Sequence, residues 1–143
     1  MLRKVLDANR LIRYWQTSRP ENISDARRLA RQLIDLKGTG AIVTPVVIEF
    51  VGGTRDSGDL ARARAFLDEF DVIDNGRILA EDFVHALRLA EPRRGITRRR
   101  SFADCLIRAI ADRLHYEVDT EDAGMPRSLP RRSVPKSQQR RRR

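Results

Sequence analysis

The chain has 143 residues, which is enough for one domain with a buried core, and its hydrophobic content of 41% favours a globular body. Its formal net charge is +9, but residues 127–143 carry eight basic side chains and no acidic one, so the remainder is nearly neutral at +1. A membrane-spanning helix is excluded, because no stretch approaches the roughly 18 apolar residues that it needs.

The remaining composition bounds the compartment and the domain organisation. A single cysteine, Cys105, excludes an internal disulfide framework and is consistent with a reducing cytoplasm. We expect no signal peptide, because Asp7 and Arg10 interrupt any apolar run that follows the basic start. Residues 127–143 contain few apolar side chains and cannot build a core. We therefore predict a folded domain over residues 1–126, followed by a disordered basic tail, in a cytoplasmic protein that does not bind membranes.

The first part of the chain predicts a strand followed by two helices. Residues 3–7 have the character of a short strand, and residues 9–16 that of a turn and short helix. A longer helix is predicted over residues 24–37, where apolar side chains recur at helical spacing and glycines follow. Either Asn22 or Ser24 could cap this helix.

A second strand leads directly into another helix. Residues 41–44 form a compact apolar run, typical of a strand that is covered on both faces. Thr44 suits the N-cap and Pro45 the first position of the helix that follows, which a glycine pair would end. Glu49 would then lie about one turn into this helix.

The second half of the chain continues the alternation of helices and strands. Helices are predicted over residues 59–70, 77–91 and 102–114, and short strands over residues 71–74 and 116–118. In the clearest of these helices, Asp104 lies in the first turn. Strands and helices that alternate in this way favour a parallel sheet with right-handed crossovers. The sequence therefore predicts an α/β fold.

Four acidic residues lie where predicted elements begin or end: Asp7, Glu49, Asp104 and Asp122. In an open α/β sheet the carboxyl ends of parallel strands meet at one crevice, where ligands bind. Carboxylates gathered there repel one another unless a divalent cation neutralises them. Such a site can polarise a phosphodiester and generate hydroxide. The pattern therefore predicts a metal site that hydrolyses a nucleic-acid backbone.

Each acid also has an ordinary structural explanation. Asp7 could be a turn residue at a strand end, Asp104 a carboxylate that favours a helix N-terminus, and Glu49 a solvated helix residue. Its apolar neighbours indicate that the helix of Glu49 is largely buried, so an acid there needs a partner.

The last acid and the basic residues before the third acid leave further alternatives open. Asp119 and Glu121 compete with Asp122 as the fourth acid, and a solvated acidic loop explains all three nearly as well. The basic cluster just before the third acid could hold RNA phosphates or be a solvated loop, and its candidates for RNA binding are Arg98, Arg99 and Arg100.

The motifs around the four acids resemble those of PIN domains in order, spacing and structural context. They are VLDANRLI at residues 5–12, TPVVIEFVG at 44–52, FADCLIRAIA at 102–111 and TED at 120–122. The resemblance covers residues 1 to about 126, and the size and layout are most similar to VapC-type toxin ribonucleases. Arg10 and Cys105 stand where this family has small or apolar residues, and no aromatic residue closely follows Asp122.

The resemblance implies a fold and a site. The fold would be a three-layer α/β/α sandwich with a central parallel sheet. The residues that would bind Mg²⁺ or Mn²⁺ and carry catalysis are Asp7, Glu49, Asp104 and Asp122. Asn9 and Thr120 would orient carboxylates or water around the ion.

The resemblance also implies an activity and partners. The protein would be a metal-dependent endoribonuclease whose products end in a 5′-phosphate and a 3′-hydroxyl. It would be the toxin of a type II toxin–antitoxin pair, bind a cognate antitoxin protein and form a homodimer. Two alternatives remain open, namely a non-catalytic PIN-like RNA-binding module and an RNA-maturation nuclease without an antitoxin.

Overall fold

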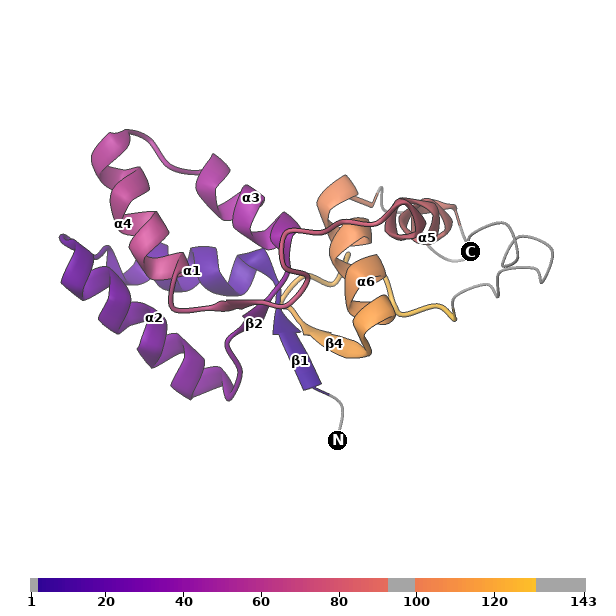
Figure 1. Cartoon of the computed structure of the whole chain (residues 1–143), viewed down its shortest axis with the longest axis horizontal. Coiled ribbons are helices and arrows are strands. Elements are labelled where there is room, and N and C mark those ends of the chain that lie inside the picture. The colour runs from indigo at the N-terminus through magenta and orange to yellow at the C-terminus, as the bar shows by residue number, and fades with distance from the viewer. Residues whose placement is uncertain (1–2, 93–99, 131–143) are drawn as a thin grey trace.

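The structure is a computed structural model that describes residues 3–92 and 100–130. Within these ranges the elements follow in the order β1 (Arg3–Leu6), α1 (Ala8–Ser18), α2 (Ile23–Lys37), β2 (Ala41–Ile42), α3 (Thr44–Gly52), α4 (Ser57–Leu67), β3 (Asp71–Val72), α5 (Ala80–Ala90), α6 (Phe102–Leu114) and β4 (Tyr116–Asp119). Figure 1 shows the strands in the middle, with α1 to α4 on one side and α5 and α6 on the other. The predicted α/β sandwich is therefore confirmed.

The strands pair in parallel, as predicted. β1 lies beside β4, with Arg3 opposite Tyr116 and Leu6 opposite Asp119. β2 lies beside β3 and pairs Ala41 with Asp71. Because β1 and β4 run in the same direction, the segments that follow their carboxyl ends emerge at the same edge.

The prediction that Thr44 caps α3 is wrong. The N-cap is Val43, and Pro45 is the second helical residue instead of the first. The buried carboxylate of Asp74 accepts hydrogen bonds from the Thr44 N–H (2.9 Å) and hydroxyl (2.7 Å). A side chain from the turn after β3 therefore takes the place of a local cap, and the strand before α3 ends at Ile42.

The predicted helix over residues 77–91 begins three residues late, at Ala80. A turn with Asn75 and Gly76 at positive φ precedes it. The fully buried carboxylate of Asp82 then accepts a hydrogen bond from the Leu79 N–H at 2.9 Å, which fixes the start. The other helices match their predictions to within two or three residues at each end, and the Asn22 cap of α2 is confirmed.

An aromatic cluster holds the helices on one side of the strands together. Phe66 on α4 is fully buried, with its ring centroid 5.2 Å from Phe50, 5.1 Å from Trp15 and 5.2 Å from Phe70. Aromatic rings dominate core energetics because each buries a large apolar area. This cluster therefore anchors α1, which begins directly after Asp7, and α3, which carries Glu49.

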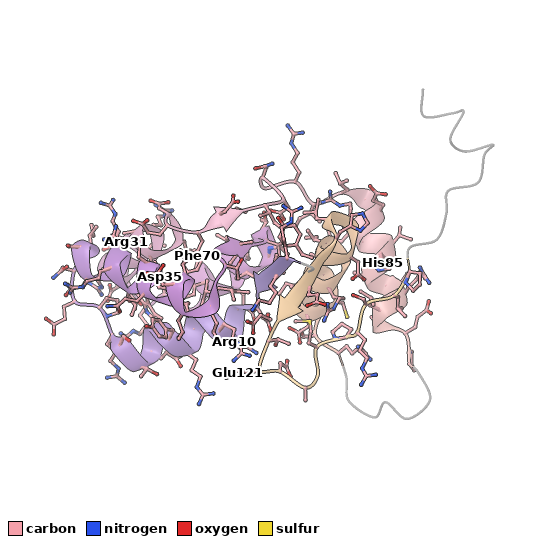
Figure 2. The ribbon with its side chains drawn as sticks, turned by 90° about the horizontal axis from the view of Figure 1, so that it is seen from below. Arg10, Arg31, Asp35, Phe70, His85 and Glu121 are labelled. Carbon is pink, nitrogen blue, oxygen red and sulfur yellow. The ribbon has the colours of Figure 1, made fainter. Side chains whose placement is uncertain are left out.

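On the other side, the start of the predicted tail packs along α5 and α6. The Leu129 N–H donates to the Asp112 carboxylate on α6 (3.3 Å), and Arg88 on α5 donates to the Pro130 carbonyl (3.0 Å). Asp112 also lies 2.9 Å from the buried ring of His85, which Figure 2 labels on α5. The chain up to Pro130 is thereby tied to the folded body.

The described helices were also compared with the length and hydrophobicity that a membrane-spanning helix requires. Across residues 3–92 and 100–130, no helix is both long and apolar enough to cross a membrane. The single cysteine, Cys105, is a free thiol buried on α6.

Candidate metal centre

Asp7 lies where β1 ends and α1 begins, and its carboxylate is only 2% exposed. One oxygen accepts a hydrogen bond from the Ala8 N–H at 2.8 Å, which caps α1. The other oxygen accepts a hydrogen bond from the Thr120 hydroxyl at 2.7 Å. Both bonds stabilise the charged form, and they keep this carboxylate pointing to the loop that follows β4.

The third and fourth acids meet across the same edge. Asp104 lies in the first turn of α6, where its N–H donates to the Ser101 hydroxyl at 3.0 Å. Asp122 lies in the loop after β4, and its N–H donates to Thr120 Oγ1 at 2.9 Å. The side chains of Asp104 and Asp122 are within hydrogen-bonding reach of each other.

The pKa values of three of the acids are raised, first by burial and then by the acids near them. Burial raises the pKa of Asp104 to about 6, with the hydrogen bond to Asp122 and the charge of Asp7 adding to the effect. Burial also raises the pKa of Asp7, and the charge of Asp122 adds to this. Glu49 is exposed at the surface, but partial desolvation of its carboxylate, followed by the charges of Asp7 and Asp122, still raises its pKa. The structure therefore brings all four predicted acids within electrostatic range.

The four carboxylates do not form one closed coordination shell. Among the residues that the structure describes, no three His, Cys, Asp or Glu side chains are placed to hold one ion together. Mg²⁺ usually takes one or two carboxylates and keeps several waters, so this spacing fits a hydrated ion better than a tight cage. The donors are carboxylate oxygens, which hard cations prefer.

Of the two residues expected to orient groups around the ion, Thr120 contacts Asp7 directly, and Asn9 contacts Thr120. The Asn9 amide donates to Thr120 Oγ1 at 3.2 Å, while its own oxygen is buried and has no hydrogen-bond donor within the described residues. A buried amide oxygen of this kind is rare, because desolvation without a partner is unfavourable. A water held beside Asp7 would satisfy it. The orphaned oxygen is therefore a second observation that fits a hydrated cation.

The structure separates the three competing candidates for the fourth acid. Asp119 pairs with Arg10 at 2.9 Å, and Glu121 pairs with both Arg10 and Arg13. The hydrogen bond from Arg13 is the main reason that the pKa of Glu121 is lowered. Figure 2 shows Arg10 and Glu121 close together at the edge of the molecule. Asp122 is thus the acid of this loop that faces Asp104.

Basic residues near the centre were only partly foreseen. Arg98 and Arg99 lie outside the described residues, while Arg100 is half-buried and lines a cavity of about 250 Å³. Arg108, which the sequence analysis missed, lies one turn after Asp104 and within electrostatic range of Asp7. Burial lowers the pKa of its guanidinium, and nearby acids oppose that shift. Its spacing of four residues from Asp104 was the available signal.

The family model described as the PIN domain matches residues 4–127, a range that contains all four acids. No curated protein and no solved structure matches the chain.

Proposed function

This chain belongs to the PIN-domain family, and from that premise we propose that it is a metal-dependent endoribonuclease and the toxin of a type II toxin–antitoxin pair. PIN domains are generally nucleases that use divalent metal ions. The observation that carries the proposal is the meeting of acids at one edge of the fold, where Thr120 joins Asp7 to the loop of Asp122 and Asp122 faces Asp104 in the first turn of α6. Gathering acids against their own repulsion is unfavourable, unless a cation or protons neutralise them.

The proposed roles follow from the position of each side chain. Asp104 and Asp122, which face each other, would hold the cation directly, and Asp7 and the more exposed Glu49 would hold its waters. A bound Mg²⁺ or Mn²⁺ would supply a water of lowered pKa and stabilise charge on the phosphate. Thr120 would hold Asp7 in one orientation.

The first test is cleavage itself. We expect the purified chain to cut single-stranded RNA with Mn²⁺ or Mg²⁺ and to lose activity by about 10³-fold or more in EDTA, because the bound ion would both lower the pKa of the attacking water and stabilise charge on the phosphate. Gel analysis of labelled RNA would show 5′-phosphate and 3′-hydroxyl ends. Equal cleavage in EDTA would refute the metal site. RNA binding without any metal-dependent product would favour the non-catalytic alternative.

The toxin role needs a partner that masks the site. Apolar side chains near the start of α6 support such a partner, because Phe83, Leu87 and Phe102 are 46%, 67% and 72% exposed. Exposed apolar patches of this kind mark protein interaction sites. We propose that an antitoxin protein covers this surface, and that the chain works in the cytoplasm as a homodimer.

Growth assays separate the toxin from a maturation nuclease. We expect expression in bacteria to arrest growth, and co-expression of a small protein from the neighbouring gene to restore it. Cleavage activity without growth arrest would favour RNA maturation, and light scattering that gives the mass of a single chain would contradict the homodimer.

The basic residues beyond Pro130 are proposed to add nonspecific RNA affinity. Removing residues 131–143 deletes seven basic side chains. Each phosphate contact on a single strand contributes roughly 0.7 to the slope of log affinity against log salt, so we expect weaker binding and a shallower slope. Fluorescence anisotropy without divalent metal measures both. A full-length variant with the same seven residues changed to Gln is the control for length, and an unchanged slope in both would exclude a role in binding.

A further inference from the structure

Arg10 makes an arrangement of contacts that the family resemblance does not account for. Its guanidinium donates from Nε to Asp119 Oδ1 (2.9 Å), from Nη1 to Glu121 Oε1, and from Nη2 to the Thr120 carbonyl (3.1 Å). Three consecutive residues of the loop are therefore bound by one planar group, which projects from the first turns of α1. A guanidinium suits this task because its donors form a rigid fork. Figure 2 shows the Arg10 and Glu121 ends of this contact.

The middle residue of that bound triplet is the one that contacts the metal centre. The Thr120 hydroxyl donates to Asp7, and it accepts hydrogen bonds from the Asn9 amide and from the N–H of Asp122. The backbone of Asp7 also donates to the Asp119 carbonyl at 2.9 Å, which extends the pairing of β1 with β4. A shift of this loop would therefore move both the partner of Asp7 and the carboxylate of Asp122.

Charge repulsion makes such a shift favourable unless it is opposed. The loop carries Asp119, Glu121 and Asp122 within four residues, beside Asp7 and Asp104. Arg10 is only 19% exposed at its side chain, so its ion pairs are less screened by water than those on the open surface. It neutralises the two acids that do not face the centre and leaves Asp122 to face it.

We propose that Arg10 is a positioning residue that holds the loop of residues 119–122, so that Thr120 stays on Asp7 and Asp122 stays opposite Asp104. The effect on metal binding rests on the proposed function, whereas the effect on the loop does not. Arg10 does not touch the reacting atoms in this proposal. It acts through the loop, and its contribution is a preformed site.

Arg13 provides a matched control for testing this role. It lies one turn further along α1, binds Glu121 through one nitrogen, and is 74% exposed. Arg10→Met and Arg13→Met remove the same charge from the same helix, but only the first releases Asp119 and Thr120. A third variant, Arg10→Lys, keeps the charge and loses the fork.

Two measurements read the loop and the metal separately. In metal-free protein, hydrogen exchange at Asp122 and Gly124 should speed up by about 10-fold in Arg10→Met and stay unchanged in Arg13→Met, since both amides are bonded within this loop. Mn²⁺ affinity measured by calorimetry should fall by about 10- to 100-fold in Arg10→Met, the usual effect of losing a group that orients a ligand. With saturating metal, kcat should fall while KM for RNA stays constant.

The outcomes separate the two levels of the proposal. Unchanged exchange in Arg10→Met, or equal effects of Arg10→Met and Arg13→Met, would overturn the positioning role. We expect Arg10→Lys to resemble Arg10→Met in exchange and in Mn²⁺ affinity. Wild-type values in Arg10→Lys would overturn the role of the guanidinium fork, because charge alone would then suffice to hold the loop. A native protein that binds no Mn²⁺ would refute the proposed function, and the exchange data would still decide whether Arg10 holds the loop.

Discussion

Replacing Asp104 with Asn is expected to abolish RNA cleavage and, at the same time, to stabilise the metal-free protein. Cleavage should fall by about 10³-fold or more, because the amide keeps the shape but loses the charge that would hold a cation. The free energy of unfolding should rise by about 1 kcal/mol at pH 7.5 in EDTA, since the amide no longer repels Asp7 and Asp122 and can donate to Asp122. Full conversion of the pKa shift would overstate the gain for a partly exposed group.

The size of this gain in stability depends on pH. The pKa of Asp104 is raised in the folded state from 3.8 to about 6, so the folded protein binds more protons than the unfolded chain between these values. The stability from this group is therefore fully present below about pH 3.8 and is lost as the pH rises through about 6. Thermal unfolding of metal-free wild type should show this decline more steeply than Asp104→Asn. Parallel curves for the two proteins would contradict the assignment.

Asp7→Asn is expected to lose cleavage activity as Asp104→Asn does, but without becoming more stable. Both Asp7 oxygens already accept hydrogen bonds, one from the Ala8 N–H and one from the Thr120 hydroxyl. In Asn the amide NH₂ would replace one of these oxygens and would face one of the two donors without an acceptor. We expect the same loss of cleavage as in Asp104→Asn, but no gain in stability. A clear rise in the unfolding temperature of Asp7→Asn would show that repulsion outweighs these two bonds.

Replacing Phe66 with Ala is expected to lower the free energy of unfolding by about 3–5 kcal/mol, the usual effect of removing a buried ring. The ring is fully buried and contacts Phe50, Trp15 and Phe70. Urea unfolding in EDTA measures the change without any contribution from bound metal. A loss of this size is a large fraction of the stability of a small domain.

Phe102→Ala is the matched control for that experiment. The same ring is removed from a side chain that is 72% exposed, so the free energy of unfolding should change by no more than about 0.5 kcal/mol. If Phe66→Ala were as mild as Phe102→Ala, the aromatic cluster would not be the anchor of α1 and α3.

Local patterns in the sequence were sufficient to predict most of the helices of this fold. The apolar stripe and the Asn22 cap defined α2, and the Ser101–Asp104 junction defined the start of α6, because caps and helical spacing act between residues close in the chain. The start of α3 was misplaced, since its cap is Asp74, thirty residues away. No local pattern reports a partner at that distance.

The sequence by itself determined which acids could form a site, because order and spacing place them at the ends of elements. Only the tertiary structure decided how they are arranged. The sequence does not show which of three acids is the fourth site residue: Asp119, Glu121 or Asp122. In the structure the first two form ion pairs with Arg10 and Arg13 on α1, and Asp122 does not. The raised pKa of Asp104, the contacts of Arg10 with the loop and the closeness of Arg108 to Asp7 likewise depend on distances across the fold. Charge interactions are set by separation in space and by burial, and neither can be read from separation along the chain.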